Sequence, residues 1–187
     1  MRDFFLTTAR LGFSVWSEED LNDALELWGN AKVTKLIVAD GEMSEKQVYE
    51  RLKTEIEMYK NYNIQYWPIY LKETNENVGC CGLRPYDYEN KIFEIGIHLK
   101  DNYWGAGIAS EACIAVIKYA FTNLNAKAIF AGHNPKNIAS AQLLKKLGFT
   151  YTHDEFYPPT GLSHPSYLMT EQEYKIKYVM GGNKLWK

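Results

Sequence analysis

The feature that most constrains the fold is a strand, a glycine turn, a helix and a second strand, in that order, between residues 92 and 132. IFEIGIHLK (92–100) predicts a strand, and apolar residues then recur at helical spacing along ASEACIAVIKYAFTNL (109–124). KAIFAG (127–132) is a short apolar segment typical of a buried strand. A strand, helix and strand in this order form a crossover, which favours a parallel pair of strands.

The segment before this unit predicts one strand and two helices. Leu11–Val15 alternates apolar and small residues, as a half-buried strand does. Ser17 and Ser44 are each followed three residues later by an acid or an amide, so each is expected to cap a helix. The acids and lysines of the second helix predict a solvated face.

Antiparallel strands are expected before the crossover, and a further helix and two strands after it. Segments 66–72 and 78–84 are joined to each other and to the strand at 92–100 by polar turns, which predicts a meander. Beyond residue 132 we expect, in order, a helix ending at Gly148, a strand from Phe149, a loop, a strand over 164–170 and a closing helix over 171–178.

These elements predict a single α/β (α+β) domain over residues 1–187. Its sheet is expected to be mixed and mostly antiparallel, with about six or seven strands flanked by about four or five helices. Residues 179–187 are expected to form a flexible tail.

The glycine turn predicts an anion site. Gly105 and Gly107 precede a helix whose first amides lack carbonyl partners and carry the positive end of the dipole. A Walker A loop is excluded because Ile108 follows Gly107, and a dinucleotide fingerprint is disfavoured because Ser110 replaces its third glycine. A turn that only connects a strand to a helix is the alternative.

Composition limits the partners. With 21 basic and 23 acidic side chains the net charge is −2, which gives no general attraction to nucleic acid or anionic lipid. No apolar run is long enough to span a membrane, and the default location is the cytoplasm. Three cysteines (Cys80, Cys81 and Cys113) favour buried thiols over a disulfide framework or a zinc site, and no metal is expected. On a strand, the adjacent pair would point to opposite faces.

The motifs around the turn resemble those of the GNAT superfamily of acyl-CoA N-acyltransferases, most closely its ribosomal-protein N-terminal (RimJ/RimL-like) acetyltransferase branch. Trp104–Ala109 is similar to the family's Gln/Arg-x-x-Gly-x-Gly/Ala pattern from Gly107 onward, and Asn137–Ser140 with Lys146–Phe149 is similar to its Asn-x-x-Ser and Lys-x-Gly-Phe segment. The resemblance covers residues 5–178. Further matches are Thr8–Leu11, Ser17–Asp20, Leu27–Trp28, Gly79–Leu83 and Tyr167–Thr170.

The resemblance implies an acetyl-CoA site in a V-shaped gap between the strands at 92–99 and 127–132. The pantetheine arm would bond to backbone near Ile97, His98 and Leu99, and Asn137 would lie beside it. The pyrophosphate would be held by Gly105, Ala106, Gly107, Ala109 and Ser110, mainly through backbone amides.

The same resemblance implies direct attack of an amine on the thioester. The tyrosine that serves many members as general acid is replaced by Leu144, so Ser140 is the candidate donor to the thiolate. Glu94 is the candidate base for the amine proton, with His98 and His133 as rivals. Asp154 and Glu155, in a segment expected to be a loop, are further candidates for holding the amine. Each of these residues also has a purely structural alternative.

The function expected is acetyl transfer from acetyl-CoA to a primary amine, either a protein N-terminus or a small amine. The alternatives are a non-catalytic acyl-CoA-binding module and a nucleotide-binding regulatory domain. A monomer and a homodimer are both compatible with the sequence.

Overall fold

The computed structural model describes residues 2–158 and 160–181. Helices and short helical turns alternate with strands along the chain. In chain order the elements are β1 (Leu6–Thr7), β2 (Leu11–Phe13), a 3-10 turn (Glu18–Asp20), α1 (Leu21–Trp28), α2 (Ala31–Thr34), α3 (Glu45–Tyr62), β3 (Tyr66–Leu71), β4 (Asn77–Asp87), β5 (Ile92–Leu99), a 3-10 turn (Asp101–Tyr103), α4 (Ile108–Asn123), β6 (Ala128–Gly132), α5 (Ile138–Leu147), β7 (Thr150–Tyr157), β8 (Leu162–Thr170), α6 (Glu171–Tyr174) and a π-helical turn (Lys175–Met180).

The described strands form one eight-stranded sheet in the order β1-β2-β3-β4-β5-β6-β8-β7. Within it β5 and β6 pair in parallel and the other neighbours are antiparallel, which confirms the predicted crossover and meander. The strand count exceeds the expected six or seven because β1 spans only two residues, too few to show alternation. The four-residue α2 was missed for the same reason, and it brings the described α-helices to six.

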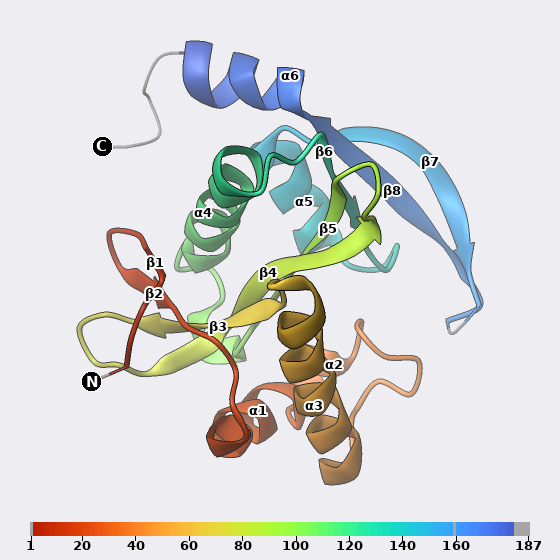
Figure 1. Cartoon of the computed structure of the whole chain (residues 1–187). Coiled ribbons are helices and arrows are strands. Elements are labelled where there is room, and N and C mark those ends of the chain that lie inside the picture. Colours follow the sequence, from red (N-terminus) through yellow and green to blue (C-terminus); the bar gives the residue numbers. More distant parts are fainter. Residues whose placement is uncertain (1, 159, 182–187) are drawn as a thin grey trace.

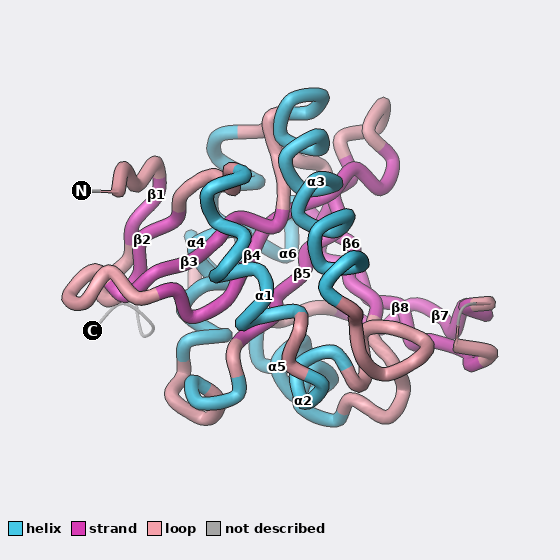
Figure 2. The backbone as a smooth tube through the Cα atoms, turned by 90° about the horizontal axis from the view of Figure 1, so that it is seen from below, coloured by secondary structure: helices cyan, strands magenta, loops and turns pink. Residues whose placement is uncertain are grey.

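Helices cover both faces of the sheet (Figure 1). Seen from below, α1 and α3 cross in front of the central strands (Figure 2), and their core includes Trp28, Leu52 and Cys80. Helices α4 and α5 pack on the opposite face in a core that includes Cys81 and Cys113. All three thiols are free and buried, and the adjacent pair enters different cores, as predicted.

The predicted helix signals are confirmed. Ser17 and Ser44 form capping boxes with Asp20 and Gln47, so the backbone amides at both helix starts are satisfied. Gly148 ends α5 in the left-handed conformation at φ 87°, which glycine adopts without steric cost.

Two burial predictions are wrong. Strand β2 is buried along its whole length because the Phe4 ring covers Gly12, where a β-carbon would lie 2.4 Å from that ring. The expected solvated face of α3 contains Glu55, which is fully buried. Two partners of this carboxylate, Tyr66 and Arg84, come from β3 and β4, and helical periodicity carries no information about them.

At the other end of the sheet, β7 and β8 form a long curved ribbon that extends away from the helices (Figure 1). Every residue of β7, the edge strand of the sheet, is exposed. Helical structure continues through Met180, so residues 179–180 of the expected tail are helical, and residue 181 forms a bend. Residues 182–187 of that tail lie outside the described residues.

Candidate active site

The site begins where β5 and β6 part. Glu94 and Phe130 form the last parallel pair, although β5 continues to Leu99. Two cavities lie along the gap, one of about 510 Å³ that contains Glu94 and one of about 480 Å³ that contains the glycine turn. We call them the Glu94 cavity and the glycine-loop cavity. They adjoin, because both are lined by Leu36, Ile37, Ile97, His98, Asn137, Ser140 and Leu143.

The glycine-loop cavity brings most of the predicted cofactor residues together. Gly105 and Gly107 have φ of 76° and 77°, a left-handed conformation that residues with a β-carbon rarely adopt. Helix α4 begins directly afterwards, so its first-turn amides are free to bind an anion. Of the predicted cofactor residues, those that line this cavity are Ile97, His98, Leu99, Gly105, Gly107, Ala109 and Asn137, whereas Ala106 and Ser110 lie beside it in the chain. Ser140, the predicted donor to the thiolate, also lines it.

The backbone of β5 divides its hydrogen-bonding groups between β4 and the gap. Lys100 N donates to Val78 O at 3.0 Å, and alternation along an antiparallel pair then directs the backbone groups of His98 toward β4. The groups of Ile97 and Leu99 therefore face the gap. The carbonyl of Leu99 accepts a hydrogen bond from Trp104 Nε1 at 2.9 Å, which leaves Ile97 as the residue with both backbone groups toward the gap.

An ion pair between Arg10 and Glu111 stabilises the glycine turn. Arg10 Nε lies 2.6 Å from Glu111 Oε2, and Arg10 Nη1 donates to Ala106 O at 3.0 Å. Glu111 Oε1 also accepts from Thr8 Oγ1 and from the backbone of Arg10. Two of the sequence segments that carry the family resemblance therefore meet in space, around the turn that begins α4.

Glu94 lies at the apex of the gap and lines the cavity named after it. Burial raises the pKa of its carboxyl group, and the positive charges of Arg84 and Arg51 oppose that rise. A carboxylate whose pKa is raised toward neutrality is better matched to accept a proton from an ammonium group.

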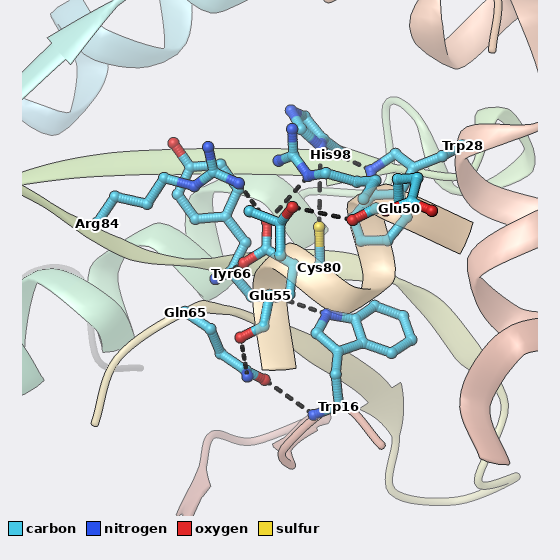
Figure 3. Close-up of polar contacts among 11 residues, drawn as sticks. Trp16, Trp28, Glu50, Glu55, Gln65, Tyr66, Cys80, Arg84 and His98 are labelled. Atoms are coloured by element: carbon cyan, nitrogen blue, oxygen red, sulfur yellow. Dashed lines mark hydrogen bonds and ion pairs between the residues drawn. The ribbon is translucent and has the colours of Figure 1, made fainter. Parts of the chain in front are cut away.

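The side chain of His98 is held by the tryptophan of α1. Trp28 Nε1 donates to His98 Nδ1 at 3.0 Å (Figure 3). The proton of the neutral ring therefore lies on Nε2. Burial, together with the charges of Arg51 and Arg84, holds the pKa of His98 well below its usual range. With its lone pair already accepting a hydrogen bond, this ring is poorly placed to take a proton.

In His133 the proton lies on the other ring nitrogen. Its Nδ1 lies 2.8 Å from the carbonyl of Asn134, which can only accept, so Nδ1 carries the proton and Nε2 carries a lone pair. That Nε2 is buried and has no partner among the described residues. The ring stacks on Tyr167 and lines the Glu94 cavity. Of the two histidines, His133 therefore has the free basic atom.

Asn137 and Ser140 sit where the two cavities meet. Asn137 caps α5, and its Oδ1 accepts from Ser140 N at 3.1 Å, so the predicted capping role is confirmed. No hydrogen bond joins Ser140 Oγ to any described residue. Leu144, one turn farther along, is buried and lines the Glu94 cavity without offering a proton.

The predicted loop around Asp154 and Glu155 is wrong, since both residues belong to β7. Glu155 lines the Glu94 cavity, whereas Asp154 is not among the lining residues and accepts a hydrogen bond from Tyr151 Oη at 3.3 Å. The β-ribbon therefore brings one of these two acids to the site.

Sequence reasoning missed a buried charge cluster on the wall of the Glu94 cavity. Glu55 of α3 accepts hydrogen bonds from Arg51 and Arg84, and its other oxygen accepts from Tyr66 N at 2.9 Å (Figure 3). Both arginines and Tyr66 line the cavity. The spacing of Arg51 and Glu55 is that of a surface i,i+4 pair, so the sequence carried no signal of their burial.

Lys32 and Lys136 line the glycine-loop cavity and were also missed. Lys32 is paired with Asp101 at 2.8 Å. Within the described ranges, no three His, Cys, Asp or Glu side chains gather in a way that could hold a metal ion. None of the described helices combines the length and the apolar character needed to cross a bilayer.

Comparison with known proteins identifies relatives of this architecture. The family model for the acetyltransferase (GNAT) domain matches residues 10–150. The uncharacterized N-acetyltransferase p20 of Bacillus licheniformis is 34% identical over 144 residues, which are 77% of this chain and 81% of that protein.

Two solved structures share the fold at low sequence identity. RimL, a ribosomal L7/L12 α-N-protein acetyltransferase in complex with coenzyme A, has a TM-score of 0.76 at 15% identity, covering 90% of this chain and 98% of its own. The spermidine N-acetyltransferase of Vibrio cholerae, in complex with CoA and spermine, has a TM-score of 0.75 at 17% identity, covering 89% and 99%.

Proposed function

Because this chain belongs to the acetyltransferase (GNAT) family, we propose that it transfers the acetyl group of acetyl-CoA to a primary amine in the gap between β5 and β6. The observation that carries the proposal is the junction of the two cavities. The glycine-loop cavity suits the donor and the Glu94 cavity suits the acceptor, and they meet beside Ser140 at the point where the strands part.

The residues present fit acetyl-CoA, which supplies the acetyl thioester. The positive φ angles of Gly105 and Gly107 open the start of α4, and a β-carbon built at Gly105 would have no atom within 4 Å. The amides of the first turn would hold the pyrophosphate, and the exposed Lys136 adds a positive charge beside it. On its gap side Ile97 is paired with no described strand, so its backbone N–H and C=O could bond to the arm that follows.

Glu94 is the proposed proton acceptor for the amine. In support, Glu94 belongs to the last β5–β6 pair and lines the Glu94 cavity, from which an amine would approach the donor. His133 lines the same cavity, and its Nε2, which has no partner among the described residues, could accept the proton from the carboxylate through water.

Ser140 is the proposed donor to the departing thiolate. Its hydroxyl has no hydrogen-bond partner among the described residues, and it lies at the start of α5, where the helix dipole favours negative charge. Leu144 supplies no proton, and Ser140 lines both cavities at their junction, which supports the serine as the donor.

The acceptor is a primary amine of a protein N-terminus or of a small molecule. The two structural neighbours named above act on one acceptor of each kind, an α-N-protein substrate and spermidine. We expect the reaction in the cytoplasm, where acetyl-CoA is available.

The test is an acceptor panel on the full chain. Purified protein is mixed with acetyl-CoA and with peptides, amino acids or polyamines, and CoA thiol release and acceptor mass are measured. Amine-dependent release, with one acetyl group added to the acceptor, is expected. Binding of acetyl-CoA without amine-dependent release from any acceptor would identify a non-catalytic acyl-CoA-binding module. Binding of ATP or NAD in place of CoA would identify a nucleotide-binding domain.

A further inference from the structure

Two arginines from distant parts of the chain form one wall of the Glu94 cavity. Arg51 comes from α3 and Arg84 from β4, and their side chains are 17% and 24% exposed. The Arg84 guanidinium lies 4.6 Å from the Tyr66 ring centroid, and that of Arg51 lies 5.6 Å from the same ring. Both guanidinium groups are therefore fixed by packing and face a cavity rather than bulk solvent.

Their shared partner leaves part of their charge and hydrogen-bonding capacity unused. Glu55 is the carboxylate that bonds to both, so two positive charges face one negative charge in the cluster. Each guanidinium has five N–H groups, but each donates only one of them to Glu55. Arg84 Nε is buried and has no partner among the described residues.

Other charged or titratable groups on the cavity come from different walls. Glu94 forms no ion pair with either arginine, although their charges lower the pKa that its burial raises. Glu155 and His164 belong to the β7–β8 ribbon, and His133 follows β6. The cavity therefore has a cationic side at Arg51 and Arg84, and an acidic group where the amine would react.

We propose that the acceptor is a primary amine that also bears a carboxylate, which Arg51 and Arg84 bind while the amine nitrogen lies beside Glu94. Guanidinium groups bind carboxylates through paired, charge-assisted hydrogen bonds, and a preorganised pair loses little entropy on binding. A polyamine lacks the anion and would bring positive charge against the arginines. The inference rests on the proposed acetyl transfer and specifies its acceptor.

The test uses matched acceptors. Free amino acids are compared with their α-carboxamides, peptides beginning with Asp or Glu are compared with the Asn or Gln forms, and spermidine is included. For the carboxylate member of the preferred pair we expect kcat/KM to be about 10- to 100-fold higher, the range for hydrogen bonds to a charged group. The two sets of pairs distinguish an α-carboxylate from an acidic side chain.

Arg84→Gln and Arg51→Gln should each reduce that preference about tenfold, whereas Lys60→Gln, on the exposed face of α3, should leave it unchanged. A second measurement is the shift in melting temperature that each acceptor causes in the presence of CoA, which reports binding without turnover. It also shows whether each variant is folded.

Equal or better turnover of carboxamides or spermidine would overturn the carboxylate inference and leave acetyl transfer standing. Absence of turnover with every amine would overturn acetyl transfer. In that case the binding shifts still decide the inference: an equal shift from carboxylate and carboxamide would overturn it, and a shift restricted to the carboxylate and lost in Arg84→Gln would support it.

Discussion

Replacing Glu55 with alanine should destabilise the protein strongly, although the residue lies on a helix that looks solvated in the sequence. Glu55 is fully buried and accepts hydrogen bonds from Arg51, from Arg84 and from the backbone of Tyr66. Its removal leaves two guanidinium groups uncompensated and one buried amide unsatisfied. Breaking a buried ion pair from one side costs about 3–5 kcal/mol.

The structure places Glu55→Ala at the lower end of that range. The two arginine side chains keep 17% and 24% of their exposure, so water can solvate part of the charge left behind. We therefore expect a loss of about 3 kcal/mol in the free energy of unfolding, measured by urea denaturation. Glu55→Gln keeps an acceptor for the Tyr66 amide and should lose less.

Glu57→Ala is the matched control, because Glu57 is exposed on the same helix and should change stability by no more than about 0.5 kcal/mol. A loss below about 1 kcal/mol for Glu55→Ala would show that the ion pairs of Glu55 contribute little, because that is the cost expected for a solvated carboxylate. In that case the cluster would not be the fixed cationic wall inferred here.

Three further changes test other parts of the site. Gly107→Ala forces a residue with a β-carbon to adopt a φ of 77°, which costs about 1–2 kcal/mol of conformational energy, and it should raise the KM for acetyl-CoA. An unchanged KM would contradict the role of the turn in binding the donor. Arg84→Gln removes a positive charge that lowers the pKa of Glu94, and the pKa of Glu94 should therefore rise. The acid limb of the pH profile of kcat/KM should then move to higher pH. A limb that stays in place or moves to lower pH would exclude Glu94 as the titrating base. Gly96→Ala would place a β-carbon 2.2 Å from Tyr66 Cζ and should cost about 1–3 kcal/mol by thermal unfolding; an unchanged melting temperature would mean that the ring moves freely.

The parts of the fold that local pattern controls could be predicted from the sequence. The crossover around Gly105 and Gly107, the caps at Ser17 and Ser44, and the end of α5 at Gly148 each depend on a few neighbouring residues. The same local signals located the turn that lines the glycine-loop cavity.

The parts that depend on long-range packing could not be predicted. Glu55 looks like the exposed member of an i,i+4 pair until β3 and β4 supply Tyr66 and Arg84 across it. The tautomers of His98 and His133 follow from Trp28 and from a backbone carbonyl, so only the folded chain distinguishes the two rings as bases.

The position of Glu94 where β5 and β6 part is the centre of this account, and Glu94→Gln tests it most directly. With the preferred acceptor of the panel, kcat should fall about 100-fold, the lower range for loss of a general base. The dissociation constant for acetyl-CoA should stay within about twofold, because the donor is assigned to the glycine-loop cavity. A kcat close to that of the wild type would contradict the account and place proton removal elsewhere.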